Sequence, residues 1–289
     1  MKKKIFFFGL ITVGVVAAGV VISVVWFFVA FFMSMERGEE HRRQLDAEQR
    51  SGKWDFDDQP ALFAVAHAIV KNDQEEIRAA AKTLPDLQAP GRDGTTLLYF
   101  AVTQSWPRPE LVEAVKTLLS LGADPNYTNG YRNSFAMANA VHGSALLLRY
   151  MLEAGGDPNT RDEFGQPIIL MNWYLGYYKN DARARLDLLL DRGADINSTM
   201  PERESDSAGY TLLLYRTKMG LDDNLAYADA LTLVERAADP HRAAANGMTF
   251  AKMLMEHRRH FTAGKRRTPP EFETLWKWAH THRILAQPE

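Results

Sequence analysis

Four short strings in this sequence are close copies of one another: Gly122-Ala123-Asp124-Pro125-Asn126, Gly155-Gly156-Asp157-Pro158-Asn159, Gly193-Ala194-Asp195-Ile196-Asn197 and Ala237-Ala238-Asp239-Pro240-His241. The first two begin 33 residues apart. Aliphatic pairs lie three and four positions before each string, at Leu118/Leu119, Met151/Leu152, Leu189/Leu190 and Leu233/Val234. Self-similarity at a period of about 20–50 residues is typical of repeat architectures. The strings therefore predict an array of similar units.

Each unit is expected to hold two helices joined by a short turn. The positions seven, four and three residues before each string are apolar and share one face of a helix. The glycine that opens three of the strings can adopt the left-handed conformation that ends many helices. Asp followed by Pro or Asn favours a tight turn after it. Since one unit cannot bury its apolar face alone, neighbouring units are expected to stack into one core.

The repeating pattern resembles the ankyrin repeat family, whose period is about 33 residues. The stretch Asp93-Gly94-Thr95-Thr96-Leu97-Leu98-Tyr99-Phe100-Ala101 is similar to the family's opening motif, with Leu97 and Tyr99 where the family has proline and histidine. The resemblance implies an all-α, ankyrin-like solenoid of about six helix-turn-helix repeats over residues 60–289. The first repeat, at residues 61–88, is the weakest, and the others begin near Asp93, Tyr131, Phe164, Ala208 and Asn246.

The sequence also departs from the family pattern on the first helix of several repeats. Asn139, Asn172 and Arg216 stand where the family usually has a packed alanine. These polar residues indicate either displaced repeat boundaries or a widened groove along the first helices.

An apolar segment precedes the repeats. Residues 5–33 contain no charge and no proline. About 20 apolar residues are enough to cross a bilayer as a helix, whereas a cleaved signal peptide has an apolar region of only about 7–15 residues. We therefore expect a basic N-terminus at residues 1–4, a transmembrane signal anchor at 5–33 and a polar linker at 34–59.

The orientation of this anchor does not follow from counting Lys and Arg, because basic residues both precede and follow it. Moving Lys2, Lys3, Lys4 and the amino terminus outward would cost about 2.3 kcal/mol per charge for every 100 mV. This cost favours a single-pass protein of a bacterial inner membrane with its C-terminal domain in the periplasm. An inverted anchor would leave the domain facing the cytosol.

Composition and motifs exclude several kinds of site. The chain has no cysteine, so it has no disulfide, no thiolate zinc site and no cysteine nucleophile. Its net charge of −2 gives no support to nucleic-acid binding. The common catalytic and phosphate-binding motifs are missing, and His257 and His260 lack a third ligand nearby. We therefore expect no metal, no cofactor, no small-molecule substrate and no enzymatic activity.

Recognition of another protein is the function that remains. In the ankyrin family, partners usually dock on hairpin tips and on the face of the first helices, and Tyr, Trp and Arg are common at binding hot spots. Carried over to this sequence, the resemblance implies binding residues at Tyr127, Asn129, Tyr131, Arg132, Arg161, Glu163, Phe164, Asn172, Trp173, Tyr174, Tyr177, Met200, Glu202, Arg203, His241 and Arg242. The basic segment 257–267 is expected to be a solvated loop near the C-terminal cap.

The sequence thus predicts a non-enzymatic, membrane-tethered protein-binding module. One version is an immunity or inhibitor protein that binds a toxin or enzyme at the membrane, and another is a tethering scaffold for a resident periplasmic enzyme. An inverted anchor would make it a cytosol-facing adaptor. An enzyme with a site in the helix-one groove, around Asn139, Asn172 and Arg216, is the last alternative, and the missing general base and nucleophile weigh against it.

Overall fold

The computed structural model describes residues 47–48, 50–171, 181–202, 206–264 and 267–285. Contacts divide the chain into Met1–Trp54 and Asp55–Glu289. The second unit holds the repeats. The anchor predicted at residues 5–33 lies outside the described residues and stays a prediction. Within the described ranges, no helix is long and apolar enough to cross a membrane.

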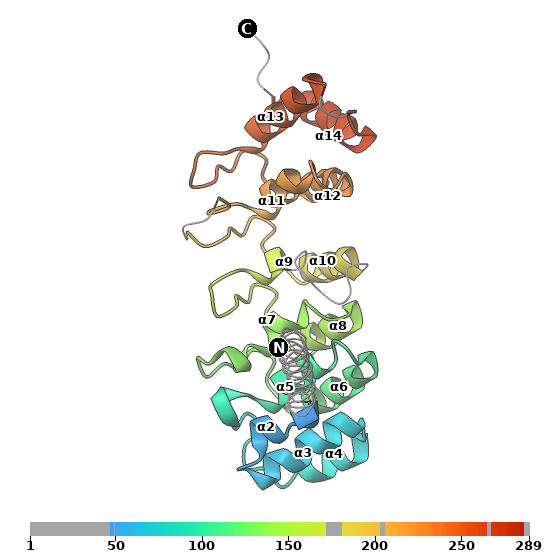
Figure 1. Cartoon of the computed structure of the whole chain (residues 1–289), viewed down its shortest axis with the longest axis vertical. Helices are drawn as coiled ribbons and strands as arrows, with labels where there is room; N and C mark the ends of the chain where they lie inside the picture. Colours follow the sequence, from blue (N-terminus) through green and yellow to red (C-terminus); the bar gives the residue numbers. More distant parts are fainter. Residues whose placement is uncertain (1–46, 49, 172–180, 203–205, 265–266, 286–289) are drawn as a thin grey trace, which may run out of the picture. The chain divides into compact units, whose positions relative to one another are not determined.

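Helices in consecutive pairs make up the second unit, as the repeat pattern predicts (Figure 1). The described residues include no named strand, and the 3₁₀ turns are η1 (Arg92–Gly94), η2 (Pro109–Leu111) and η3 (Arg132–Ser134). After the short α2 (Lys53–Phe56), the described pairs are α3 (Pro60–Lys71) with α4 (Gln74–Ala81), α5 (Leu97–Gln104) with α6 (Val112–Ser120), α7 (Ala136–Ala140) with α8 (Ala145–Glu153), α9 (Ile168–Met171) with α10 (Ala182–Asp191), α11 (Leu212–Met219) with α12 (Leu225–Glu235), and α13 (Phe250–Thr262) with α14 (Pro270–Thr281).

Local capping explains where many of these helices begin and end. The hydroxyls of Thr96, Ser144, Thr211 and Thr249 each accept a hydrogen bond from the backbone N–H three residues on, at 3.2–3.3 Å. At the other end, Gly122, Gly155 and Gly193 adopt φ values of 96°, 91° and 88°. A side chain built on these glycines would meet no atom within 4 Å, so the left-handed backbone alone is what favours glycine there.

The apolar faces of the helix pairs join into one core cluster that runs from α3 to α14. The predicted helical face is buried: Val115, Leu148, Leu186 and Ala230 all belong to the core. Phe56 falls in the range predicted as a polar linker, yet it is fully buried and packs edge-to-face on Phe100, with ring centroids 5.7 Å apart. The packed core therefore begins before the residue at which the sequence pattern places it.

The loops that join consecutive pairs project on the side of the first helices (Figure 1). Two of them matter for the site: the loop between α6 and α7, residues 121–135, and the loop between α8 and α9, residues 154–167.

Candidate functional site

The repeated strings form the bases of the loops, where their polar side chains hold the backbone. In all four strings the aspartate accepts a hydrogen bond from the backbone N–H two residues on, at 2.8–2.9 Å. The asparagine then reaches the next repeat. Asn126 accepts from the N–H of Asp157 at 2.7 Å and donates to the carbonyl of Gly155 at 2.8 Å.

The same bridge recurs one repeat further along. Asn159 accepts from the N–H of Asp195 at 2.8 Å and donates to the carbonyl of Gly193 at 3.1 Å. Asn197 accepts from the N–H of Asp239 at 2.8 Å. We call Asn126, Asn159 and Asn197 the asparagine ladder. Its side chains join successive loops, so the loop bases serve the fold.

Above its base, loop 121–135 carries an exposed tyrosine on a fixed turn. Tyr131 is 61% exposed. The Asn129 side chain accepts from the N–H of Tyr131 at 3.0 Å and donates to the carbonyl of Gly94 at 3.1 Å. A Cβ atom on Gly94 would lie 2.4 Å from Cβ of Tyr131, so only a glycine lets the tyrosine approach this closely. Asn129, a predicted contact residue, is thus engaged in holding the loop.

Loop 154–167 presents an aromatic residue in the same way. Phe164 is 48% exposed. Oδ1 of Asp162 accepts from the N–H groups of Phe164, at 2.9 Å, and Gln166, at 2.7 Å. Arg161 donates from Nη1 to the carbonyl of Gly165 at 2.7 Å. The polar side chains beside Phe164 therefore fix the turn that displays it.

An ion pair links the two loops. Nε of Arg132 lies 2.9 Å from Oε1 of Glu163, and the arginine side chain is 73% exposed while the glutamate is 17% exposed. The pair joins two predicted site residues from neighbouring repeats. Most of what it shows to solvent is the guanidinium group.

Tyr99 of α5, which was not predicted as a binding residue, is half-buried against the core near this ion pair. Burial raises the pKa of its phenol; the charge of Arg132 opposes that rise, and the charges of Glu163 and Asp55 add to it. Tyr99 therefore lies within electrostatic reach of the ion pair. The only sequence feature that marks Tyr99 is its place in the opening motif, at the position where the ankyrin family has histidine. We define the tip patch as Tyr131, Arg132, Glu163 and Phe164.

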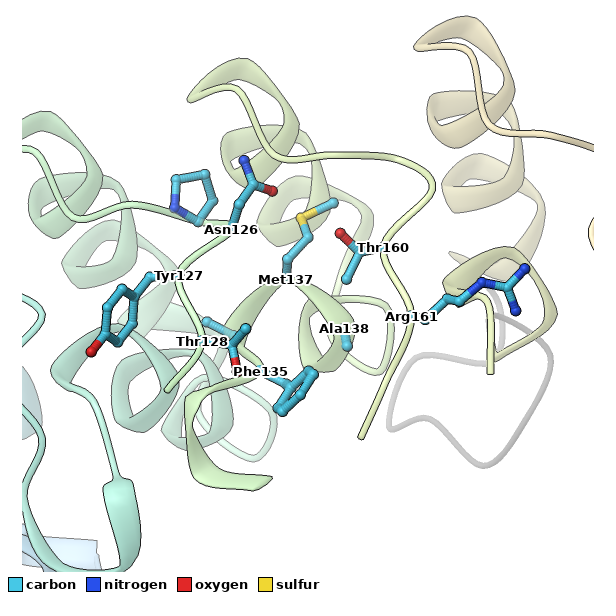
Figure 2. Close-up of a pocket in the computed structure, with 10 residues that line it drawn as sticks. Asn126, Tyr127, Thr128, Phe135, Met137, Ala138, Thr160 and Arg161 are labelled. Atoms are coloured by element: carbon cyan, nitrogen blue, oxygen red, sulfur yellow. The ribbon is translucent and has the colours of Figure 1, made fainter. Parts of the chain in front are cut away.

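A small, mainly apolar pocket of about 80 Å³ opens between the same two loops and α7 (Figure 2). Figure 2 shows Met137 of α7 between Thr128 of one loop and Thr160 of the other, and the Arg161 guanidinium points away from the other lining residues. Tyr127, a predicted site residue, contributes to the wall. The full lining is Pro125, Asn126, Tyr127, Thr128, Phe135, Ala136, Met137, Ala138, Thr160 and Arg161.

The remaining predicted site residues fall into three groups. Glu202, His241 and Arg242 are exposed, as surface residues should be. Asn172, Trp173, Tyr174, Tyr177 and Arg203 lie outside the described residues. Met200 was predicted on an exposed tip and is instead buried in the core. Its backbone is the reason: the N–H of Met200 donates to the carbonyl of Tyr210 at 2.9 Å, which turns this part of the loop inward.

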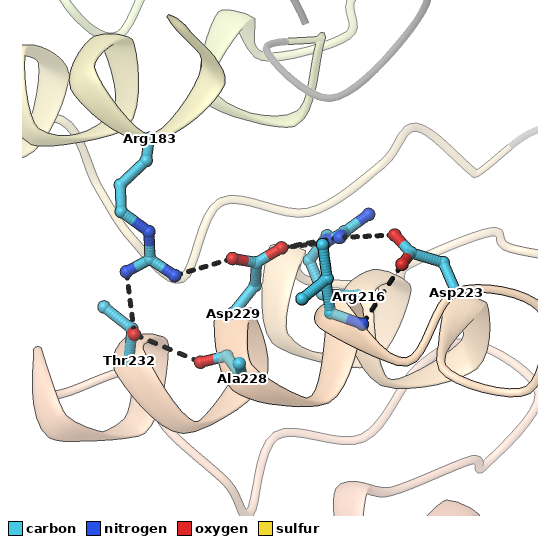
Figure 3. A network of polar contacts seen from close by, with 7 residues as sticks. Arg183, Arg216, Asp223, Ala228, Asp229 and Thr232 are labelled. Carbon is cyan, nitrogen blue, oxygen red and sulfur yellow. Dashed lines mark hydrogen bonds and ion pairs between the residues drawn. The ribbon is translucent and has the colours of Figure 1, made fainter. Parts of the chain in front are cut away.

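The polar residues on the first helices are engaged inside the protein. Arg216 of α11 binds Oδ2 of Asp229 on α12 through Nη2 at 2.5 Å, and both side chains are nearly buried, at 9% and 11% exposed. Asp223 lies 3.4 Å from the same guanidinium. Figure 3 shows Asp229 between Arg216 and Arg183, and Arg183 binds its Oδ1 at 2.7 Å. Asn139 donates to the carbonyl of Phe135 at 2.8 Å.

These contacts give Arg216 and Asn139 structural roles, and they weaken the alternative of a catalytic groove around them. Among the residues that the structure describes, no cluster of three or more His, Asp or Glu could hold a metal ion.

The basic segment at residues 257–267 differs from its prediction. Helix α13 continues to Thr262, and His257 and Phe261 are buried. Nδ1 of His257 lies 2.9 Å from the Tyr227 hydroxyl, and burial lowers the pKa of His257 to about 4, with a smaller contribution from His260. Arg258 pairs with Glu273 of α14. The expected solvated loop is therefore largely helix packed into the C-terminal cap, because apolar side chains at helical spacing interleave with its charges.

Comparison with known proteins agrees with the repeat architecture. Residues 93–130 match the family model described as ankyrin repeat. The crystal structure of EF0377, an ankyrin repeat protein, resembles this chain with a TM-score of 0.56 and 20% sequence identity, over 75% of this chain and 97% of that one. No curated protein matches the chain in sequence.

Proposed function

We propose that this chain, which carries an ankyrin repeat at residues 93–130 and folds as an ankyrin-repeat solenoid, binds another protein without catalysing a reaction. The tip patch is the observation that carries the proposal. Its Tyr131, Arg132 and Phe164 are exposed on two adjoining loops, whereas the neighbouring Asn129 and Asp162 are engaged in fixing those loops.

The chemistry and rigidity of the tip patch both suit protein binding. Tyrosine and arginine are enriched among the side chains that contribute most to interfaces. Binding costs less when the contact residues are already ordered. The bonds of Asn129 to Gly94 and of Asp162 to its own turn order the loops before any partner arrives.

The tether is a proposal drawn from residues 5–33, whose apolar length matches a single span. It would hold the binding surface close to a bacterial inner membrane, on the periplasmic side. A C-terminal reporter that is active only outside the cytoplasm should be active when fused to the full chain. An inactive reporter in a stable fusion would assign the domain to the cytosol and make the protein a cytosol-facing adaptor.

Two roles would use the same surface. An immunity or inhibitor protein would protect cells from a toxin or enzyme encoded beside it, and a scaffold would retain a resident periplasmic enzyme at the membrane. Expression of the neighbouring gene product with and without this chain separates them. Protection supports the inhibitor, and a product that is harmless in both cells supports the scaffold.

Crosslinking in intact cells, followed by mass spectrometry, tests the binding function itself. The full-length chain should capture one dominant partner, and Tyr131→Ala/Arg132→Ala should lose it. The matched control is Arg149→Ala/Tyr150→Ala, which removes a guanidinium and an aromatic ring from α8. A partner that both double variants retain would place binding elsewhere, and no partner at all would contradict the proposed function.

A further inference from the structure

The tip patch presents mainly positive charge to solvent, although it contains one acid and one base. Glu163 is mostly covered while Arg132 is mostly exposed. Near the tip, Asp162 accepts two backbone N–H groups of its own turn. The exposed Asp124 and Asp157 lie at the loop bases, where each accepts a backbone N–H. The charge at the loop tips is therefore chiefly positive, from Arg132 and the neighbouring exposed Arg161, with Tyr131 and Phe164 as exposed rings on the same two loops.

The pocket adds an apolar element to this arrangement. Loops 121–135 and 154–167 build both the pocket and the ion pair. Phe135, Met137, Thr128 and Thr160 are among the residues that line this mainly apolar pocket, and the Arg161 guanidinium points away from it (Figure 2). A charged side chain would lose its hydration there without a matching charge, whereas an aliphatic side chain would gain by burial.

We propose that the partner docks through an acidic, apolar segment, which places a carboxylate on Arg132 and an aliphatic side chain in the pocket. This inference rests on the proposed protein-binding function and specifies the chemistry of the partner. Arginine has five N–H donors, and the ion pair with Glu163 is made through Nε. Hydrogen bonds between arginine and carboxylate are among the stronger ones in proteins. A basic segment would be repelled from the same place.

A peptide selection on the full chain tests this chemistry and does not require the partner to be identified. The probe is a library of random 12-residue peptides displayed on phage, panned against full-length protein in detergent. The enriched peptides should carry Asp or Glu within a few residues of Leu, Ile or Val. For a synthetic copy of the best peptide, replacing its acids by amides should weaken binding at least tenfold.

Three variants locate the peptide on the surface. Arg132→Gln should weaken binding of the acidic peptide at least tenfold, and Arg149→Gln, which removes an exposed guanidinium from α8, should leave it unchanged. Glu163→Gln removes the acid that pairs with Arg132 and competes with the peptide for it, so binding of the acidic peptide should become several-fold tighter. A loss of folding cannot produce that gain.

Each other outcome overturns the inference. Enriched peptides that are basic or uncharged would refute the carboxylate, and indifference to Arg132→Gln would refute its position. If no peptide is enriched, the surface does not bind a short acidic segment. In all these cases the crosslinked partner decides the proposed function separately, because a partner lost in Tyr131→Ala/Arg132→Ala would still establish protein binding at the tips.

Discussion

Two arginine–carboxylate pairs in this protein have similar short contacts and opposite surroundings. Arg216 and Asp229 meet between α11 and α12, where both are nearly buried and Arg183 adds a second guanidinium. Arg132 and Glu163 meet at the tips of two loops, where the arginine faces solvent. A buried charge must find its partner within the protein. An arginine whose side chain is mostly exposed to water can pair with a carboxylate of another protein. Burial, and not residue type, thus separates the pair that joins the two helices of one repeat from the pair proposed to bind.

Breaking the buried pair should have the largest effect on stability. Arg216→Ala leaves Asp229 with Arg183 as its described ion-pair partner, in a site where Asp229 is almost wholly buried. Removing one member of a buried pair costs about 3–5 kcal/mol. Urea unfolding of the full chain, followed by circular dichroism, should show a loss in this range. A loss below about 1 kcal/mol would mean that the pair is not a structural element.

Lowering the pH tests the contribution of a second buried polar group, His257, to the stability of the fold. The pKa of His257 is about 4 in the folded chain and 6.5 in its ordinary state. The fold therefore favours the neutral ring, and this contribution is complete above pH 6.5 and decreases as the pH falls toward 4. The free energy of unfolding should decrease by about 2 kcal/mol between pH 7 and pH 5 from this group alone.

The control for the pH measurement is His257→Gln, which keeps a polar partner for the Tyr227 hydroxyl but does not titrate. Its free energy of unfolding should change less with pH than that of the wild-type chain over the same range. Equal slopes in the two proteins would show that His257 is not buried as a neutral group.

The loop bases should show an intermediate effect. Asn159→Ala removes two hydrogen bonds to the next repeat, to the N–H of Asp195 and the carbonyl of Gly193. At about 0.5–1.5 kcal/mol for each bond, a loss of about 1–3 kcal/mol is expected. His241→Ala, on an exposed residue of the last string, should change stability by less than about 0.5 kcal/mol. Similar losses in the two variants would contradict the ladder.

Breaking the exposed pair should have the smallest effect on stability. Arg132→Gln removes an ion pair whose arginine is mostly in solvent, and such pairs contribute about 0–1 kcal/mol. The urea midpoint should therefore stay close to that of the wild-type chain. A loss as large as that of Arg216→Ala would mean that the tip pair holds the loops together and is not free for a partner.

The sequence predicted the fold because its evidence is local and repeated. The glycine, aspartate and aliphatic positions of the four strings each have a physical role that recurs within a repeat, namely a helix end, a turn and a buried face. Four copies of one pattern make its register clear. The bridges formed by Asn126 and Asn159 were not predicted, because they join residues about one repeat apart and depend on how the loops stack.

The candidate site was predicted less completely, because exposure depends on the course of each loop. Met200 has the sequence context of a tip and turns into the core. Arg216 looked like an unusual groove residue until Asp229 was seen beside it. Tyr99 lies near the tip pair although 33 residues separate it from Arg132. Contacts between residues well apart in the sequence decide all three cases: Met200 with Tyr210, Arg216 with Asp229, and Tyr99 with the tip pair. The spacing of the repeated strings does not contain these contacts.

The affinity of the crosslinked partner for Arg132→Gln tests the central claim most directly, when measured on purified full-length protein beside the urea midpoint of the same sample. Wild-type chain and Arg149→Gln serve as references. We expect at least tenfold weaker binding by Arg132→Gln with an unchanged midpoint, and no change in either quantity for Arg149→Gln. Unaltered affinity in Arg132→Gln would contradict the assignment of binding to the tip patch.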